Sequence, residues 1–579
     1  MEEVRRPLVA CALCWSLTAI GAPRPAPPNR SRAGGAAHPR KPSLAGAKPP
    51  SRVEQARRAT ASPRAPVAAR RPAKETPPKT DAQTTARVAA DPSDPHEQRI
   101  QILRDRLESV LRDLPLRRTR VGVEVMAATD GDVLFAHNAD RLFNPASNTK
   151  MLTTAAALTH LGGDFRYTTA LYGAEPDAAG VVHGDVDLRG SGDPSLSSAD
   201  LADLARAVAE RGITRIDGAV LVDGRFRDRA HGGASVGEQA LILNRNTYAV
   251  RVRPTEPKHA ALVEIEPALP EWAVIENRVT TVAGKKTRLR FDQRRDRDGV
   301  RLVVTVSGRI NDRSDALARR RIPDATLYAA ATLRRALLDR GVDVGGSVRL
   351  GALPADTPLL AEHLSIPLSE ICRVSNKESN NFVADTIFKT TGGELYGAPG
   401  TFAKGTRAVD ELLAPLGFGH GAYTIVNGSG LTHANRIQPS GLARLLRHLY
   451  FDLSVAPEFL ASLAVGGIDG TIRGRFLGTD AVGLVRAKTG TLSGVSALSG
   501  YVGDTGDVLV FSIFVEGFRH RTLAAVRRAQ VRMVEAMLAY LRSDEAKPRP
   551  GGGEPGQPMP AAPVDDSESD GDPVGAGGE

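Results

Sequence analysis

Cysteine is scarce in this chain of 579 residues, which has only three. Cys11 and Cys14 lie in an apolar N-terminal stretch, where their C-x-x-C spacing indicates coincidence more than a redox or metal motif. Only Cys372 lies in the body of the chain, which excludes an internal disulfide there. The sequence also has no H-E-x-x-H motif and no cluster of Cys and His, so we expect no metal and no other cofactor.

Long apolar runs are missing too, which argues against an integral membrane span. Residues 1–21 place arginines before a short apolar stretch, as in a secretory signal, although two early glutamates are atypical. The segment Leu8-Val9-Ala10-Cys11 matches a lipoprotein cleavage box. Almost no apolar segment precedes it, so an ordinary export signal fits better.

Hydrophobic periodicity is absent from residues 22–98, which are rich in Pro, Ala and Arg and carry nine more basic than acidic residues. We expect a disordered linker there and a disordered acidic tail over residues 543–579, where acids exceed bases by seven. The linker lacks interleaved aromatic residues, so we do not expect it to bind nucleic acid. A solvated linker, or one that contacts anionic envelope surfaces, fits better.

The body between these ends has the pattern of a folded α/β protein. Apolar residues at helical spacing predict helices over residues 98–112, 151–161, 369–389, 438–450 and 523–541. Alternating patterns predict strands over residues 119–127, 133–136, 495–502 and 508–515, paired across Asp130-Gly131 and Gly503-Asp504.

A long stretch of 232 residues separates Ser147 from Ser379, enough for one or two inserted domains without a short internal repeat. Its strand signals are at residues 181–188, 219–223, 249–252 and 302–307, with a helix over 325–340. We therefore divide the chain into a leader (1–21), a linker (22–98), a domain in two parts (99–190 and 355–542), a mainly β insert (191–354) and a tail (543–579).

An S-x-x-K motif, Ser147 to Lys150, opens the helix expected over residues 151–161. Residues i and i+3 share a helix face, so Lys150 lies one turn from the Ser147 hydroxyl. A lysine whose pKa is lowered by burial can take the serine proton, and the helix N-terminus favours negative charge on the attacking oxygen. Alone, this motif indicates only a helix cap with a surface lysine.

Two further motifs follow in the order of a serine acyl-transferase: S-x-N at Ser379 and Asn381, and K-T-G at Lys488, Thr489 and Gly490. We expect Ser379 to relay a proton and Asn381 to hold the lysine and a substrate amide. Singly, S-x-N is a common capping pattern and K-T-G an ordinary strand-edge lysine.

The K-T-G motif is expected before a strand, at a sheet edge where a cation and hydroxyls meet a substrate carboxylate. Gly490 leaves room for a ligand backbone, and the N–H of Thr491 can join that of Ser147 in an oxyanion hole. Residues 231–237 contain G-x-S-x-G beside His-Gly-Gly. No strand runs into that serine, so a Gly-rich loop explains it better than a nucleophile elbow.

Together with NPASNTK at 144–150, GSGDP at 190–194, GSGL at 428–431, DGT at 469–471 and AKTGTL at 487–492, these motifs carry a family resemblance. Over about residues 100–540 the chain resembles the class C low-molecular-mass penicillin-binding proteins, which are D-alanyl-D-alanine carboxypeptidases/endopeptidases of bacterial cell walls. The large insert is similar too, whereas the small β-lactamases carry a much shorter one.

The resemblance implies an α/β (α+β) penicillin-recognising serine-transferase domain, with helices around an antiparallel sheet, in the periplasm. It implies Ser147 as the acylated nucleophile, Lys150 as its base, Ser379 and Asn381 as a relay pair, and Lys488 as carboxylate anchor. The expected ligands are peptidoglycan peptides, with β-lactam antibiotics as inhibitors. Two departures stand out, Asn380 and Asn427, because the family often has Asp at both positions; the second leaves substrate preference open.

Two alternatives remain at this point. A β-lactamase or S-x-x-K esterase would share the site, and a wall-binding protein without activity would share the fold. The sequence leaves three questions open. These are the preference for carboxypeptidase or endopeptidase activity, the oligomeric state, and whether the leader is cleaved or lipidated.

Overall fold

The computed structural model describes residues 94–222, 241–268, 272–297, 301–323, 325–419, 421–504 and 506–545. The predicted leader, nearly all of the linker, the G-x-S-x-G segment at 231–237 and the tail beyond 545 lie outside the described residues.

A six-stranded antiparallel sheet, in the order β19-β20-β21-β22-β1-β2, forms the centre of the first part of the fold. Its strands are β1 (Arg120–Ala127), β2 (Val133–His137), β19 (Ala464–Val465), β20 (Val485–Leu492), β21 (Val495–Gly503) and β22 (Val508–Glu516). Both faces of this sheet are buried. Along β22, Phe511 and Ile513 belong to one hydrophobic core and Val510 and Phe514 to the other, as the alternation of a strand requires.

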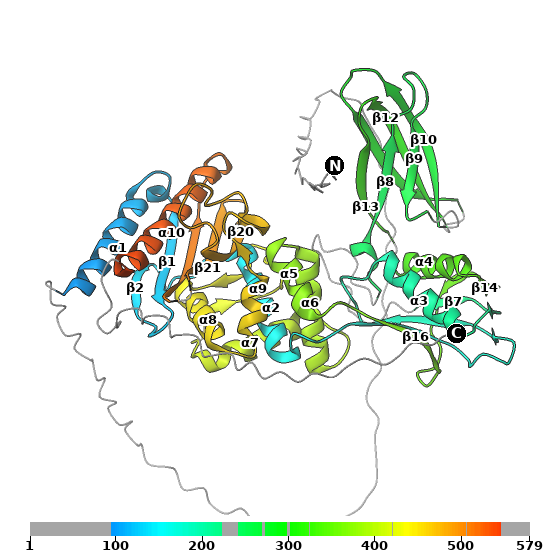
Figure 1. The fold of residues 1–579 in the computed structure, drawn as a ribbon, viewed down its shortest axis with the longest axis horizontal. Helices are drawn as coiled ribbons and strands as arrows, with labels where there is room; N and C mark the ends of the chain where they lie inside the picture. Colours follow the sequence, from blue (N-terminus) through cyan, green and yellow to red (C-terminus); the bar gives the residue numbers. More distant parts are fainter. Residues whose placement is uncertain are drawn as a thin grey trace, which may run out of the picture. The chain divides into compact units, whose positions relative to one another are not determined.

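Helices cover the two faces of the sheet (Figure 1). On one face α1 (Pro95–Arg112) and α10 (Leu523–Glu545) pack side by side, with Leu103 and Met537 in the shared core. The other face holds the helical layer: α2 (Thr149–Leu161), α5 (Leu368–Lys377), α6 (Asn381–Tyr396), α7 (Phe402–Leu413), α8 (Pro439–Phe451) and α9 (Ala456–Ser462). A two-stranded sheet of β17 (Tyr423–Thr424) and β18 (Arg436–Ile437) completes this part.

The insert begins with a five-stranded sheet of order β15-β7-β5-β3-β16 and a small parallel sheet of order β14-β6-β4. Its strands are β3 (Thr168–Tyr172), β4 (Val181–Val182), β5 (Val186–Gly190), β6 (Arg215–Ile216), β7 (Val220–Val222), β14 (Asp343–Val344), β15 (Val348–Leu350) and β16 (Leu359–Leu364). Helices α3 (Ser198–Glu210) and α4 (Ala325–Asp339) pack on each other, and α3 starts at a capping box of Ser197 and Asp200.

The remainder of the insert is a β lobe of two three-stranded sheets, with orders β10-β12-β11 and β13-β8-β9 (Figure 1). Its strands are β8 (Thr247–Arg253), β9 (Leu262–Glu266), β10 (Ala273–Val282), β11 (Arg288–Arg295), β12 (Leu302–Asn311) and β13 (Ala316–Arg321). Trp272 packs between Tyr248 and Tyr328 and anchors this lobe in a shared core.

The predicted insert boundaries at 191 and 354 cut through the five-stranded sheet. Strands β3 and β5, before residue 191, pair with β7 and β16 of the insert, and Leu171 and Leu360 share its core. Tyr167 and Leu368 already belong to the core under the six-stranded sheet. We therefore propose that the insert runs from about residue 168 to about residue 364.

The other predicted helices and strands agree with the structure except at their ends and at two breaks. The strand predicted over 181–188 is two strands, β4 and β5. Helix α1 begins at Pro95, inside the predicted linker, and α10 continues to Glu545, three residues into the predicted tail. The predicted helix over 369–389 is two helices, α5 and α6, which meet around Ser379. Among the described residues, no helix combines the length and the apolar character that crossing a membrane requires.

Candidate active site

Ser147 lies in a short 3-10 turn, η2 (Ala146–Asn148), which leads directly into α2. The sequence placed it in the first helical turn, so the prediction is correct to within this turn. Ala146, fully buried, has a positive φ of 45°. Its N–H donates to the Asn144 side chain at 2.7 Å, which holds this uncommon backbone conformation.

Two glycines allow the turn to pack closely against its neighbours. A Cβ on Gly430 would lie 1.9 Å from the Ala146 carbonyl oxygen, and one on Gly490 would lie 2.6 Å from the Pro145 carbonyl oxygen. Gly490 belongs to β20, so the absence of a side chain lets this strand approach the serine turn.

Lys150 is fully buried, and its ammonium group contacts three oxygens. Its Nζ lies 3.1 Å from Ser147 Oγ, 2.7 Å from Asn381 Oδ1 and 2.5 Å from the Ser429 carbonyl oxygen. Burial lowers the pKa of Lys150 to about 7, because desolvation disfavours the charged form. At neutral pH the neutral amine is therefore available to accept the hydroxyl proton of Ser147.

One carboxylate faces this lysine, and sequence reasoning missed it. Asp385, on α6, accepts a hydrogen bond from the Ser429 N–H at 2.7 Å, and its negative charge raises the pKa of Lys150 against the effect of burial. Burial in turn raises the pKa of Asp385. A lone Asp within an apolar-periodic helix carries no motif, so only its buried position in the fold reveals it.

Ser379 and Asn381 lie where α5 ends and α6 begins. Ser379 has a φ of 57°, and the Asn380 side chain caps α6 by accepting from the Val383 N–H at 3.1 Å. Asn at position 380, where the family often has Asp, therefore still serves as a helix cap. The sharp turn directs Asn381 to Lys150 and Ser379 to Lys488.

Lys488 is fully buried on β20 and donates to Ser379 Oγ and to the Thr489 carbonyl oxygen, both at 2.8 Å. Burial lowers its pKa well below the usual range, and the charges of Lys150 and Arg475 lower it further. The Thr489 hydroxyl donates to Thr471 Oγ1 at 2.8 Å. The structure thus brings K-T-G next to S-x-N and to the DGT segment.

The K-T-G motif lies at a strand edge and precedes β21, as the sequence predicted, and it also belongs to a strand of its own, β20. Its residues pair with β21 on one side, for example Thr489 with Leu498. On the other side β19 pairs only with Arg486 and Ala487, so β20 is an edge from Lys488 onward. The exposed Thr491 follows on this edge, as a site that receives an extended ligand requires.

Two arginines behind this edge escaped the sequence analysis. Arg527, on α10, donates to Thr491 Oγ1 at 3.2 Å, and Arg475 donates to Gln530 Oε1 at 3.4 Å. Burial lowers the pKa of Arg475 to about 10, with a further contribution from Arg527. Neither arginine has an ion-pair partner among the described residues, so this edge carries uncompensated positive charge. Only the fold shows that these arginines lie near the β20 edge, because no local sequence spacing links them to K-T-G.

The second departure from the family pattern, Asn427, supports the loop that leads to Ser429. Its Oδ1 accepts from the Gly430 N–H at 3.1 Å and from Asn435 Nδ2 at 3.2 Å. Asn435 also donates to Thr149 Oγ1 at 3.1 Å, which ties the loop to the start of α2.

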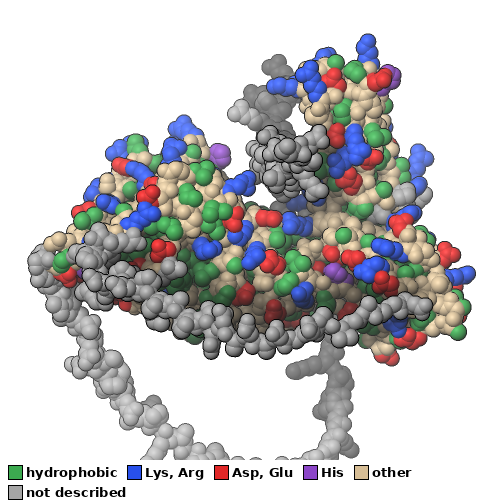
Figure 2. Space-filling model, viewed as in Figure 1, with side chains coloured by type: hydrophobic (Ala, Val, Ile, Leu, Met, Phe, Trp, Pro, Cys, Tyr) green, Lys and Arg blue, Asp and Glu red, His purple; other side chains and the backbone are tan. Residues whose placement is uncertain are grey.

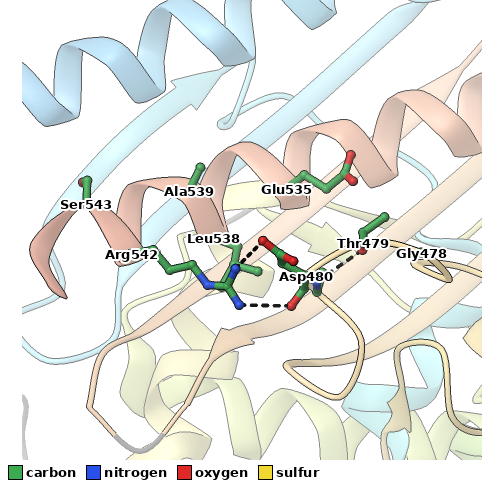
Figure 3. A pocket seen from close by; sticks show the side chains of 9 residues that line it. Gly478, Thr479, Asp480, Glu535, Leu538, Ala539, Arg542 and Ser543 are labelled. Atoms are coloured by element: carbon green, nitrogen blue, oxygen red, sulfur yellow. Dashed lines mark hydrogen bonds and ion pairs between the residues drawn. The ribbon is translucent and has the colours of Figure 1, made fainter. Parts of the chain in front are cut away.

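Among the described residues, no group of three or more His, Cys, Asp or Glu is placed to hold a metal ion. A cavity of about 580 Å³ lies between α10 and the segment around Asp480, which is ion-paired with Arg542 (Figure 3). None of the motif residues lines this cavity.

Comparisons with known proteins agree with this geometry. The family described as D-Ala-D-Ala carboxypeptidase 3 (S13) matches residues 103–537. Over 465 residues the chain is 33% identical to a D-alanyl-D-alanine carboxypeptidase of Actinomadura sp., a match that covers 76% of this chain and 85% of that protein. It is 26% identical to D-alanyl-D-alanine carboxypeptidase DacB of Haemophilus influenzae, over 69% of this chain and 86% of that protein.

The fold is likewise similar to the crystal structure of penicillin binding protein 4 from Haemophilus influenzae. The TM-score is 0.62 at 24% sequence identity, and the match covers 75% of this chain and 99% of that one. The predicted α+β penicillin-recognising fold is thereby confirmed. This chain belongs to the D-Ala-D-Ala carboxypeptidase 3 (S13) family of serine peptidases.

Proposed function

We propose that this peptidase hydrolyses the D-Ala-D-Ala ends and cross-links of peptidoglycan peptides through an acyl-enzyme on Ser147. The contact that carries the proposal is that between Ser147 Oγ and Lys150 Nζ, 3.1 Å apart, at a lysine with a pKa of about 7. A nucleophile within hydrogen-bonding reach of a base that is neutral at working pH is what serine acylation needs.

In the acylation step Ser147 Oγ attacks the carbonyl carbon between two D-residues while its proton passes to Lys150 Nζ. The N–H groups of Ser147 and Thr491 are the proposed oxyanion hole for the tetrahedral intermediate. The C–N bond then breaks, the leaving nitrogen takes the Ser379 hydroxyl proton, and the proton held by Lys150 replaces it, which leaves Lys150 neutral for deacylation. Lys488 holds Ser379 Oγ at 2.8 Å. Asn381 orients Lys150 and the substrate amide.

Deacylation uses the same groups. A water molecule attacks the ester carbonyl, Lys150 takes its proton, and Ser147 recovers its hydroxyl hydrogen as the acid leaves. β-Lactams acylate Ser147 in the same way in this proposal. A solved structure of penicillin binding protein 4 of Haemophilus influenzae is a complex with a β-lactam.

The edge formed by Lys488, Arg475 and Arg527 is the proposed binding site for the carboxylate next to the scissile bond, whose negative charge favours the protonated form of Lys488 once it binds. Thr489 and Thr491 are the proposed hydrogen-bond donors, and Gly490 is the gap for the substrate backbone. Both leaving groups, a terminal D-Ala and a cross-linked D-centre, carry that carboxylate. We infer export to the periplasm from the signal-like residues 1–21, and no cofactor takes part.

The test is the intact mass of the full chain after incubation with a fluorescent penicillin, together with release of D-Ala from a small peptide. Wild type and the surface control Ser454→Ala are expected to form a long-lived adduct and release D-Ala, and Ser147→Ala neither. Rapid penicillin turnover without an adduct would instead indicate a β-lactamase. Folded protein with neither adduct nor turnover would indicate a wall-binding protein without activity.

A further inference from the structure

The β lobe of the insert is strongly basic, and nothing in the proposed reaction uses it. Residues 247–323 hold 17 Lys and Arg against 10 Asp and Glu. Figure 2 shows several of these basic side chains on the face of the lobe that it displays. The basic residues concentrate in two strands, β11 and the last three residues of β13.

Strands β11 and β13 are each an edge of their three-stranded sheet, since among the described strands β11 pairs only with β12 and β13 only with β8. One hydrogen bond joins these two edges, and another joins β11 to β8, the neighbour of β13. The Tyr248 hydroxyl donates to Gln293 Oε1 at 2.7 Å, and Gln293 Nε2 donates to the Arg321 carbonyl oxygen at 3.3 Å. A cavity of about 440 Å³ lies here, which we call the edge groove.

The lining of the edge groove combines cations with aromatic and hydrogen-bonding groups. Its cations are Arg319, Arg320 and Arg321, next to Phe291 and Asp292. The Arg320 guanidinium stacks 4.6 Å above the Phe291 ring. A stacked guanidinium keeps its planar fork of donors oriented, which suits bidentate binding of a carboxylate or phosphate.

Charge on an edge strand also prevents edge-to-edge pairing, and exposed arginines are enough for that purpose. That purpose does not explain Arg320, because this side chain is half-buried and its Nε is a buried donor without a hydrogen-bond partner among the described residues. Neither Arg319 nor Arg320 forms an ion pair within the described part of the chain. The carboxylate of Glu266, whose pKa the charge of Arg319 helps to lower, is ion-paired with Arg251.

We propose that the edge groove binds an anionic glycan, a sugar polymer that carries carboxylate or phosphate groups, and so keeps the enzyme on its substrate. The arginines bind the anionic groups, the half-buried Phe291 offers apolar surface, and Asp292 accepts from sugar hydroxyls. The step from an anionic glycan to peptidoglycan rests on the proposed function. Because the groove and the active site share one chain, binding at the groove raises the concentration of polymer at the active site.

The test is co-sedimentation of the full chain with insoluble peptidoglycan at fixed ionic strength. The variant Arg319→Gln/Arg320→Gln removes two charges from the groove. The matched control, Arg288→Gln/Arg290→Gln, removes two exposed charges from β11 that do not line it. We expect the groove variant to bind at least about fivefold more weakly and the control to change by less than about twofold. Equal losses in both variants, or no loss in either, would overturn the proposal.

The variant Arg320→Lys keeps the charge but loses the planar fork. It is expected to show a partial loss, which keeps the test open if the double variant does not fold. A second experiment uses peptidoglycan whose carboxylates have been amidated, and it distinguishes binding to carboxylate groups from binding to phosphate groups. Lost binding assigns the site to carboxylates, and retained binding that a phosphorylated polysaccharide competes away assigns it to phosphates. Retained binding that neither treatment weakens contradicts an anion site.

A small D-Ala-D-Ala peptide separates this inference from the proposed function. All groove variants should release D-Ala from it at the wild-type rate, because the peptide is too short to need the groove. If wild type releases none, the proposed function fails. If wild type releases D-Ala and the groove variant still binds peptidoglycan normally, only the present inference fails.

Discussion

The active-site cleft and the edge groove of the insert both gather more cations than acids, yet the cations of the two sites differ in burial and in residue type. In the cleft, Lys150 and Lys488 have no exposed surface, and burial lowers the pKa of each. In the groove, Arg319 is exposed at the edge of a sheet.

This difference shows that the burial and the type of a basic residue determine its chemical role. A lysine loses its proton readily once desolvated and can become a base, whereas arginine keeps its charge and remains a recognition group. The cleft is therefore suited to proton transfer and the groove to binding.

The largest expected effect comes from removing the proposed base. Lys150→Ala should lower the rate of acylation by penicillin by roughly 10²- to 10⁴-fold, because Lys150 is the one base hydrogen-bonded to Ser147 Oγ in the described part of the chain. Stopped-flow fluorescence with a labelled penicillin measures it. Lys389, an equally buried lysine on α6, provides the control, and Lys389→Met should acylate within about threefold of wild type. Similar losses in both variants would show that packing, not proton transfer, is measured.

Lys488 is expected to come next, through the substrate carboxylate. Lys488→Met should lower kcat/KM for a peptide ending in D-Ala-D-Ala by roughly 10- to 100-fold, the cost of charge-assisted hydrogen bonds. For the same peptide with a C-terminal amide, the loss should be much smaller. An equal loss for both peptides would contradict the role of Lys488 as carboxylate anchor.

Arg527 should have a smaller effect of the same kind, since it meets the ligand edge through Thr491. Arg527→Gln is expected to raise KM for the free-acid peptide by about three- to tenfold and to leave kcat nearly unchanged. Its neighbour on α10, the exposed Arg528, gives the control Arg528→Gln, which should behave as wild type. A fall in kcat alone would place Arg527 outside carboxylate binding.

Replacing Asp385 should change the pH dependence of acylation instead of lowering its maximal rate. Its negative charge raises the pKa of Lys150, so Asp385→Asn should lower that pKa and move the acid limb of the acylation rate down by roughly one pH unit. The asparagine still offers an acceptor to the Ser429 N–H. The control is Asp410→Asn, which changes a carboxylate on α7 that accepts a hydrogen bond from the Tyr423 hydroxyl. It should leave the acid limb of the acylation rate in place. An upward shift would contradict the sign of this coupling.

Much of the cleft was predictable from sequence because its motifs act locally. The i, i+3 spacing of Ser147 and Lys150 follows from short-range geometry, whereas the turn at Ser379 interrupts a stretch that was predicted as one helix. The contacts of Asp385 and Arg527 join segments far apart in the chain, so no local pattern reveals them.

The insert was less predictable. Strand β11 reads RLRFDQRR, where charged residues obscure strand periodicity, and helix α3 was missed although Ser197 and Asp200 form its capping box. The boundaries that we propose for the insert differ from those expected from sequence because β3 joins β5 and β16, a pairing set by tertiary structure. The edge groove depends on two edges meeting in space, which the sequence does not indicate.

The contrast between a buried base and an exposed recognition group is tested most directly by the pH dependence of wild-type acylation. The second-order rate constant with a labelled penicillin should rise with pH and reach half its plateau at about pH 7, where Lys150 loses its proton. A midpoint at about pH 10, the ordinary range of lysine, or a rate independent of pH, would contradict the assignment of Lys150 as the base that burial creates.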